Sequence, residues 1–214
     1  MNNIYHFPCP KTFNLSLCLD CGQAFRWTKN GNMWTGVAHG KYIEIEQTDS
    51  EIVFHNCTED DFKKIWVNYF DLDCDYEKIV TSYDDEHLRT AVKEYDGIRI
   101  LRQEPWEALC SFIISQNNNI PRISKLIETI SERYGEKIET DDGIKYAFPS
   151  AKRLAQVTVE ELESLKLGYR AKYIADAANR VANGVLDLES VSKDNAREEL
   201  PVADDDASDT VVIH

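Results

Sequence analysis

The hydrophobic pattern of this 214-residue chain changes its period once, near Leu101. Before that point, apolar and polar residues alternate in short segments. Ile43 and Ile45, for example, alternate with glutamates, which is typical of a half-buried strand. After Leu101, apolar residues recur at spacings of three and four, which predicts amphipathic helices. Strands followed by a run of helices indicate an α+β fold.

The N-terminal part predicts an antiparallel sheet with one solvated face and a covering helix. Residues 13–56 are predicted to be β structure, with a hairpin turn at Lys-Asn-Gly-Asn, residues 29–32. The expected strands span residues 24–27, 33–38, 42–46 and 51–54. Thr58 predicts the N-cap of the covering helix. The helix face expected to lie on the sheet comprises Phe62, Ile65, Trp66, Tyr69 and Phe70. A further helix is predicted over residues 76–95.

The C-terminal part predicts four helices. Pro105 suits the first turn of the first helix, because the missing N–H would have no partner there. The second helix is expected over residues 120–134. Thr158, with Glu161 three residues on, forms a capping box that begins the third. The fourth is expected over residues 170–183.

These patterns predict the domain organisation. We expect a sheet domain over residues 1–100, a helical domain over residues 101–200 and an acidic tail over residues 201–214. Residues 138–148 are predicted to form a charged loop within the helical domain. The chain contains no internal repeat and no Pro- or Ser-rich linker.

A corner rich in side-chain amides separates the first two predicted helices. Asn117, Asn118 and Asn119 stand in succession, and asparagine favours caps and turns over helix interiors. Pro121 and Arg122 follow at the start of the next helix. A capped helix–helix turn accounts for one asparagine. Three of them followed by proline and arginine are more than a turn requires.

The charge balance opposes nucleic-acid binding at first sight. The chain has 38 Asp and Glu residues against 24 Lys and Arg residues, a formal net charge of −14, whereas phosphate binding requires a basic face. The acidic residues cluster in three short runs, however, and residues 166–180 carry only one acidic residue, Asp176. The basic residues of that segment are Lys166, Arg170, Lys172 and Arg180. We therefore expect an acidic protein with one basic face.

The six cysteines and the N-terminus indicate the compartment. The chain begins without a secretory leader, and no apolar run approaches the ~18 residues that a membrane span needs. We therefore expect a reduced, cytoplasmic protein, bacterial or nucleoid-associated. We expect no membrane partner. Cys18 and Cys21 have zinc or redox spacing, but no second pair completes a tetrahedral site. A chance pair of thiols is favoured, and no metal or cofactor is expected.

Three motifs resemble the 8-oxoguanine DNA glycosylase/AP lyase family. They are Cys-Gly-Gln-Ala-Phe-Arg-Trp at residues 21–27, Asn-Asn-Asn-Ile-Pro-Arg at residues 117–122 and Leu-Gly-Tyr-Arg-Ala-Lys-Tyr at residues 167–173. The resemblance covers roughly residues 14–200. It implies an N-terminal sheet domain, a helical glycosylase domain and a role in DNA repair. The implied activity is excision of 8-oxoguanine opposite cytosine with strand cleavage at the abasic site, and the implied partner is double-stranded DNA containing 8-oxoguanine. We expect a monomer.

The resemblance also implies how an unpaired cytosine is recognised. A protein that extrudes a base must fill the gap in the duplex and satisfy the edges of the orphaned partner. By resemblance, Asn117 fills the gap and, with Arg122 and Arg170, hydrogen-bonds the cytosine. Tyr169 resembles the aromatic wedge of the family, a device that separates base steps.

Two further residues are implied in recognising the extruded base. Gly22 matches a glycine whose carbonyl accepts a hydrogen bond from N7–H of 8-oxoguanine. Guanine has a lone pair at N7 in place of this donor. An isolated carbonyl therefore attracts 8-oxoguanine, repels guanine and so distinguishes the two bases. Phe112 matches an aromatic residue that lines the base pocket. Without the resemblance, Gly22 reads as an ordinary strand-entry glycine and Phe112 as core.

The sequence departs from the family after Leu200. Family members continue with a glycine-containing helix-hairpin-helix, a nucleophilic lysine and a catalytic aspartate. No glycine follows Gly184 here and no lysine follows Lys193, so no catalytic residue is carried over. The helical domain is therefore expected to be truncated and inactive in excision and lyase cleavage. The alternatives are a non-catalytic remnant that binds damaged DNA, or a non-functional truncated interaction protein.

Overall fold

The computed structural model describes residues 3–82, 84–188 and 190. The chain divides into two compact units. Unit 1 comprises Met1–Glu104 together with Lys137–Ala147, and unit 2 comprises Pro105–Glu136 together with the chain from Phe148 on. The predicted acidic tail and Lys193 lie outside the described residues.

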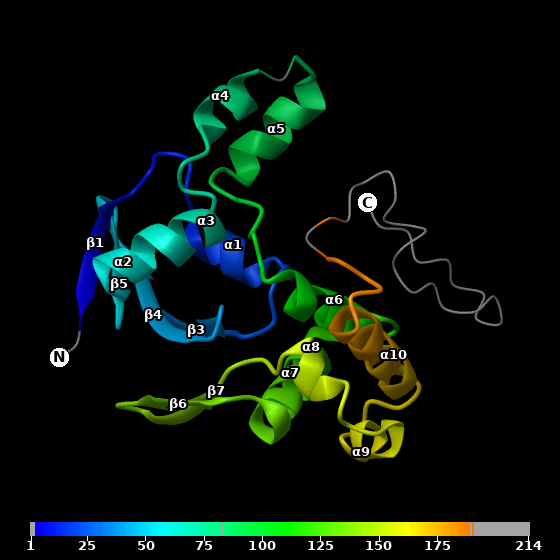
Figure 1. Cartoon of the computed structure of the whole chain (residues 1–214). Coiled ribbons are helices and arrows are strands. Elements are labelled where there is room, and N and C mark those ends of the chain that lie inside the picture. Colours follow the sequence, from blue (N-terminus) through cyan, green and yellow to red (C-terminus); the bar gives the residue numbers. More distant parts are fainter. Residues whose placement is uncertain (1–2, 83, 189, 191–214) are drawn as a thin grey trace. The chain divides into compact units, whose positions relative to one another are not determined.

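Unit 1 is built on a five-stranded antiparallel sheet of order β1-β5-β4-β3-β2 (Figure 1). The strands are β1 (Ile4–Pro8), β2 (Trp27–Asn30), β3 (Met33–Ala38), β4 (Lys41–Gln47) and β5 (Glu51–His55). The predicted sheet is confirmed, and the hairpin turns at Gly31, whose φ of 60° lies in the left-handed region. Edge strand β1 was not predicted, and the strand expected at residues 24–27 lies further along the chain, as β2, Trp27–Asn30.

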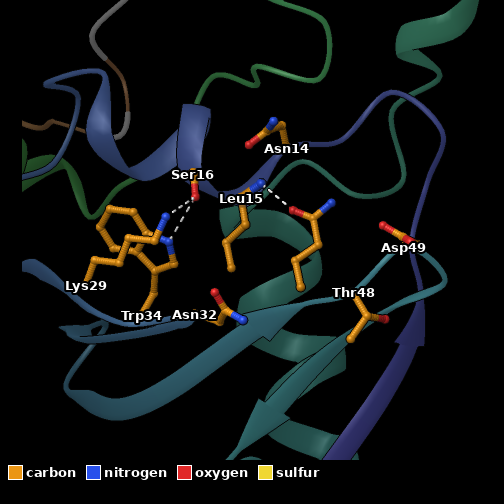
Figure 2. A pocket seen from close by; sticks show the side chains of 9 residues that line it. Asn14, Leu15, Ser16, Lys29, Asn32, Trp34, Thr48 and Asp49 are labelled. Atoms are coloured by element: carbon orange, nitrogen blue, oxygen red, sulfur yellow. Dashed lines mark hydrogen bonds between the residues drawn. The ribbon is translucent and has the colours of Figure 1, made fainter.

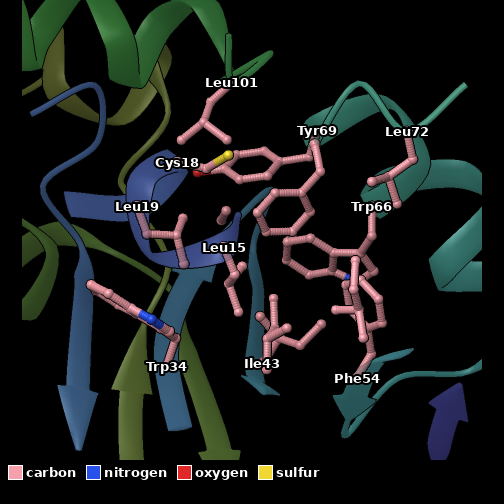
Figure 3. Close-up of a cluster of buried hydrophobic side chains, with 14 of the residues drawn as sticks. Leu15, Cys18, Leu19, Trp34, Ile43, Phe54, Trp66, Tyr69, Leu72 and Leu101 are labelled. Atoms are coloured by element: carbon pink, nitrogen blue, oxygen red, sulfur yellow. The ribbon is translucent and has the colours of Figure 1, made fainter. Parts of the chain in front are cut away.

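The predicted covering helix is confirmed. It runs without a break through α2 (Glu59–Asp61), the π-helical turn η1 (Phe62–Trp66) and α3 (Val67–Tyr69). The hydroxyl of Thr58 accepts a hydrogen bond from the backbone N–H of Asp61 at 3.0 Å, which caps the first turn. Figure 3 shows the aromatic face of this helix packed against side chains of β4 and β5. The buried residues of that contact include Phe62, Trp66, Tyr69, Phe70, Ile43, Ile45 and Phe54.

A short helix interrupts the segment predicted as continuous β structure. In α1 (Leu15–Asp20), Leu15, Cys18 and Leu19 are buried at helical spacing, and the side chain of Asn14 caps the helix by accepting from the N–H of Leu17 at 3.0 Å. One and a half turns are too short to dominate a hydrophobic period, so the expectation of strand there was wrong.

Two other elements differ from the expectation. The helix predicted over residues 76–95 is two helices, α4 (Tyr76–Thr81) and α5 (Glu86–Glu94), because Asp85 has extended backbone and caps α5. The charged loop predicted at residues 138–148 contains a hairpin of β6 (Lys137–Thr140) and β7 (Gly143–Tyr146). Alternating exposure along β6 supports this assignment.

Unit 2 is a group of helices around an aliphatic core. The helices are α6 (Pro105–Ser115), α7 (Ile120–Tyr134), α8 (Ala151–Leu154), α9 (Val159–Ser164) and α10 (Arg170–Ala182). The predicted capping box between Thr158 and Glu161 is confirmed. The N–H of Thr158 donates to the Glu161 carboxylate at 2.9 Å, and the N–H of Glu161 donates to the Thr158 hydroxyl at 3.2 Å. The short helix α8 was not predicted. The fully buried core residues include Ile114, Ile127, Ile130, Leu154, Leu162, Leu167, Ile174 and Ala177.

In the part of the chain that the structure describes, no helix has both the length and the apolar character needed to cross a bilayer. Over the same residues, no group of three or more His, Cys, Asp and Glu side chains is placed to hold a metal ion.

Candidate functional site

The asparagine corner joins α6 to α7. The side chain of Asn118 donates to the carbonyl of Ile114 at 3.0 Å, which satisfies a free carbonyl in the last turn of α6. Asn119 caps α7 by accepting from the N–H of Arg122 at 3.1 Å. Asn117 has a φ of 52°, a left-handed conformation that asparagine tolerates, and its exposed side chain takes part in neither bond. Two asparagines therefore shape the corner, and the third presents its amide to solvent.

A second loop, between α9 and α10, meets this corner. Lys166 and Gly168 in that loop have φ values of 67° and 59°. A guanidinium N–H of Arg122 donates to the carbonyl of Lys166 at 3.5 Å. The hydroxyl of Tyr169 donates to the carbonyl of Gln116 at 3.3 Å. The structure therefore brings together the corner and the motif at residues 167–173, which are about 50 residues apart in sequence.

Arg170 ties the two loops together from inside. Its side chain begins α10 and is only 4% exposed. Nε donates to the carbonyl of Gln116 at 3.0 Å, and Nη2 donates to the carbonyls of Gln116 and, at 3.1 Å, Asn117. The guanidinium also lies 4.6 Å from the ring centre of Tyr169. A buried charge requires hydrogen-bonding partners, and the backbone of the corner supplies them here.

Gln116 is a residue that sequence reasoning missed. Its carbonyl accepts from the Tyr169 hydroxyl and from two nitrogens of Arg170. Carbonyls just after a helix have no partner within it, so this acceptor is available for that purpose. The only signal in the sequence is the position of Gln116 directly after α6, which is too common to identify a site.

Exposed aromatic and basic side chains surround the corner. Tyr169 is 52% exposed, and its ring meets that of Tyr173 edge-on, with centres 6.3 Å apart and an interplanar angle of 82°. The amine of Lys172 lies 4.8 Å from the ring centre of Tyr173. Lys166 and Arg122 are also exposed. This surface can offer a ring for stacking and cations for phosphate.

Phe112 lies on α6, one turn before the corner. It is 38% exposed, whereas its neighbours Ser111 and Ile114 are buried. An apolar ring that is left partly exposed can contact a flat aromatic ligand.

Gly22 lies in unit 1, in the loop between α1 and β2. Its φ of 83° is accessible to glycine at little cost. The residues on both sides of it are held: the thiol of Cys21 donates to the carbonyl of Cys18 at 3.4 Å, and the side chain of Gln23 donates to the carbonyl of Arg99 at 2.8 Å.

The two cysteines with metal-like spacing have separate environments. Cys18 is fully buried, its thiol donates to the carbonyl of Gly97 at 3.5 Å, and burial raises its pKa to about 11. Cys21 is exposed and bonds to a different carbonyl. The geometry supports the interpretation of a chance pair.

Unit 1 also has a polar hollow of about 210 Å³ (Figure 2). The amine of Lys29 and the indole N–H of Trp34 both donate to the hydroxyl of Ser16, at 3.0 and 3.3 Å. None of the residues predicted to recognise DNA lines this hollow. It is therefore not the site that the motifs indicate.

Comparison with known proteins gives two family matches that together span most of the chain. Residues 6–109 match the 8-oxoguanine DNA glycosylase N-terminal domain, and residues 110–211 match the HhH-GPD superfamily of base excision DNA repair proteins. The second match extends beyond Leu200, where we expected the resemblance to end.

Individual relatives agree with these matches. The N-glycosylase/DNA lyase of Saccharomyces cerevisiae is 32% identical over 87% of this chain and 56% of its own length. The N-glycosylase/DNA lyase OGG1 of Arabidopsis thaliana is 31% identical over 77% of this chain and 47% of its own length. The chain thus spans about half the length of these curated relatives.

Solved structures show the same fold. The Clostridium acetobutylicum 8-oxoguanine glycosylase/lyase, in complex with double-stranded DNA containing cytosine opposite 8-oxoG, superposes with a TM-score of 0.87 at 40% identity, over 94% of this chain and 72% of that one. MBOgg1 in complex with a low-affinity DNA ligand gives a TM-score of 0.87 at 37% identity, over 94% and 73% of the two chains.

Proposed function

Because the chain belongs to the 8-oxoguanine DNA glycosylase family, we propose that it binds double-stranded DNA and recognises 8-oxoguanine paired with cytosine. The observation that carries the proposal is the convergence of Arg122, Tyr169 and Arg170 on the backbone of the asparagine corner. The proposal concerns the recognition step of base excision repair.

Asn117 is the residue that enters the duplex. When a base leaves the stack, its partner loses all its hydrogen bonds, and the gap costs stacking energy. The exposed amide of Asn117 carries both a donor and an acceptor. The left-handed backbone at this residue holds the amide at the outside of the corner.

The two arginines read the unpaired cytosine. Its O2 and N3 are acceptors, and a guanidinium offers several N–H donors in one plane. Arg122 is exposed and its bond to Lys166 is long, so it can turn towards a base at little cost. Arg170 holds the corner with Nε and Nη2, and Nη1 is the nitrogen that takes part in neither bond. We assign the cytosine contact of Arg170 to Nη1.

Tyr169 and Gly22 complete the recognition. Tyr169 stacks at the vacated step, and its hydroxyl bond to Gln116 keeps the ring oriented before DNA arrives. The carbonyl of Gly22 is the acceptor that we assign to N7–H of 8-oxoguanine. Within unit 2, the partly exposed ring of Phe112 is the surface that we assign to stacking on a base. Base and partner are then read by separate residues.

The described residues support recognition more directly than covalent chemistry. A lysine nucleophile must lose its proton near neutral pH, which requires desolvation. Within the described part of the chain no lysine is buried, and all except Lys145 are exposed. None of these lysines has the environment that a Schiff-base mechanism needs.

A gel-shift titration tests the proposal. The full chain is titrated on matched duplexes that carry 8-oxoguanine or guanine opposite cytosine, at 50 and 200 mM salt. We expect tighter binding to the damaged duplex and a steep loss of affinity with salt. Arg122→Ala should weaken binding. Arg133→Ala, at the other end of α7, makes the same charge change and should have a smaller effect. Absence of binding at low salt, or a flat salt response, would favour the alternative of an interaction protein.

A further inference from the structure

We infer that Gln23 is a positioning residue that fixes the carbonyl of Gly22 in the orientation needed to distinguish 8-oxoguanine from guanine. The inference rests on the proposed function, because it assigns a supporting residue to the same site. No bond from Gln23 to the base is involved.

The side chain of Gln23 bonds to the backbone of a neighbouring segment in two directions. Its Nε2 donates to the carbonyl of Arg99 at 2.8 Å, and its Oε1 accepts from the N–H of Leu101 at 3.0 Å. The side-chain amide of Gln23 thus pairs with the carbonyl of Arg99 and the N–H of Leu101, as the backbone of a neighbouring strand would do. The carbonyl of Gln23 also accepts from the side chain of Gln103 at 2.6 Å. Both the side chain and the backbone of Gln23 are therefore held.

The segment to which the Gln23 side chain bonds, residues 99–101, is itself held in place by further hydrogen bonds. Arg99 is 2% exposed, and its guanidinium donates to the carbonyls of Thr12 at 3.1 Å, Asp71 at 2.5 Å and Cys74 at 3.3 Å. The N–H of Arg102 donates to the carbonyl of Tyr69 at 3.0 Å. Gln23 is thus attached to a rigid part of unit 1.

This attachment controls Gly22 through covalent geometry. The carbonyl of Gly22 and the N–H of Gln23 belong to one planar peptide unit, so the carbonyl turns only with the backbone dihedrals on either side. Glycine itself restricts these dihedrals little. On the other side, the thiol of Cys21 is bonded to the carbonyl of Cys18 and receives Nε2 of Gln23 at 3.0 Å. The residues flanking Gly22 supply the rigidity that glycine lacks.

Base discrimination depends on that rigidity. A carbonyl that can turn away from guanine N7 avoids the repulsion between lone pairs and no longer rejects the undamaged base. Loss of the Gln23 bonds should therefore weaken the preference for 8-oxoguanine more than the affinity for DNA. This separates positioning from a general structural role.

Unit 1 contains a matched control in Gln47. Its Oε1 accepts from the N–H of Leu15 at 2.7 Å, and its Nε2 donates to the carbonyl of Phe13 at 2.9 Å and to the thiol of Cys9 at 3.2 Å. These are the same types of bond that Gln23 makes with Arg99, Leu101 and Cys21. None of them involves residues 21–23.

The test compares the wild-type chain with Gln23→Ala, the isosteric Gln23→Met and Gln47→Ala. Dissociation constants are measured for three duplexes that carry 8-oxoguanine, guanine or an abasic-site analogue opposite cytosine, and thermal melting records stability. We expect both Gln23 variants to reduce the ratio of guanine to 8-oxoguanine dissociation constants about tenfold, with abasic-site affinity within about twofold of wild type. Gln47→Ala should lower the melting temperature and keep the wild-type ratio.

The outcomes separate this inference from the proposed function. Wild-type preference for 8-oxoguanine with an unchanged ratio in both Gln23 variants would overturn the inference alone. If Gln47→Ala lowers the ratio of guanine to 8-oxoguanine dissociation constants as much as the Gln23 variants do, the inference is also overturned. General destabilisation would then explain the effect. Equal wild-type affinity for the 8-oxoguanine and guanine duplexes would overturn the proposed function and this inference together.

Discussion

The guanidinium of Arg170 donates to the backbone carbonyl of Gln116 through two of its nitrogens, Nε and Nη2. This links the first residue of α10 to the residue that follows α6, 54 positions earlier in the chain. The same guanidinium reaches the carbonyl of Asn117. The conformation of the asparagine corner therefore depends on a side chain outside it.

Arg170→Ala should consequently affect both stability and binding. The substitution removes the Arg170 donor to the Asn117 carbonyl and two of the three donors to the Gln116 carbonyl, which keeps only the Tyr169 hydroxyl. We expect the free energy of unfolding to fall by about 2 kcal/mol. Urea unfolding measures this loss, and a gel shift at a temperature where the variant is folded measures affinity. Arg170→Lys should rescue little, because an ammonium cannot reproduce a planar pair of donors. Full rescue by lysine would show that charge alone is required.

Asn117→Gly separates the conformation of the corner from its chemistry. Glycine adopts the φ of 52° more readily than asparagine, so stability should change by less than about 1 kcal/mol. The amide is lost, and affinity for the 8-oxoguanine duplex should fall about tenfold or more. Asn118→Ala is the control, because its side chain closes α6 and its loss should cost about 1 kcal/mol of stability. Unchanged affinity in Asn117→Gly would contradict the role of the amide.

Gly22→Ala should strain the loop before β2. A side chain at a φ of 83° costs about 1–2 kcal/mol, and the loop can relieve that strain by turning the neighbouring peptides. We expect a lower melting temperature and a reduced preference for 8-oxoguanine over guanine. Gly31→Ala, at a φ of 60° in the hairpin turn, should cost stability without changing the preference. A similar loss of preference in both variants would argue against a specific role for Gly22.

The buried thiols predict how stability depends on pH. Burial raises the pKa of Cys18 from 9.0 to about 11, and burial followed by the charge of Asp61 does the same for Cys57. A thiol with a raised pKa in the folded state stabilises the fold below its unfolded pKa, and this stabilisation is lost as pH rises. The free energy of unfolding should therefore fall between about pH 9 and pH 11. Urea unfolding at pH 8, 9 and 10 checks this, and Cys18→Ala should reduce the slope.

Borohydride trapping tests whether any described lysine forms a Schiff base with an abasic site. Because no described lysine is buried, none has the desolvated surroundings that a Schiff-base nucleophile requires, and we expect none of them to form a Schiff base with an abasic site. We expect that peptide mapping of a reaction with an 8-oxoguanine:cytosine duplex will find no adduct on Lys166 or Lys172. An adduct on either residue, abolished by its substitution with alanine, would contradict the assignment of the described residues to recognition.

Local chemistry made part of this structure predictable. The cap at Thr58, the capping box at Thr158 and the helical spacing on α7 each depend on residues close in sequence, and all were predicted correctly. Helix α1 and the β6–β7 hairpin were missed because each is too short to establish a period. The motifs also identified which side chains gather at the asparagine corner.

The parts of the site that were missed share one cause. The carbonyl of Gln116 and the backbone groups of Arg99 and Leu101 are main-chain partners, and every residue has such groups. Their use depends on which distant segments come together. A sequence therefore indicates the side chains of a site more readily than the backbone that orients them.

The β6–β7 hairpin gives the chain an interleaved connectivity. The polypeptide leaves unit 1 after Glu104, returns to it at Lys137 and leaves it again after Ala147. It therefore passes between the two units three times. A single proteolytic cut in any one of these connections leaves the units joined by the other two. Expression of residues 1–104 alone would also remove the backbone of Tyr146, to which Arg26 donates, and the carboxylate of Asp142, which lies 3.3 Å from the hydroxyl of Tyr42. Because neither unit corresponds to one continuous stretch of sequence, neither can be expressed alone as a single uninterrupted segment.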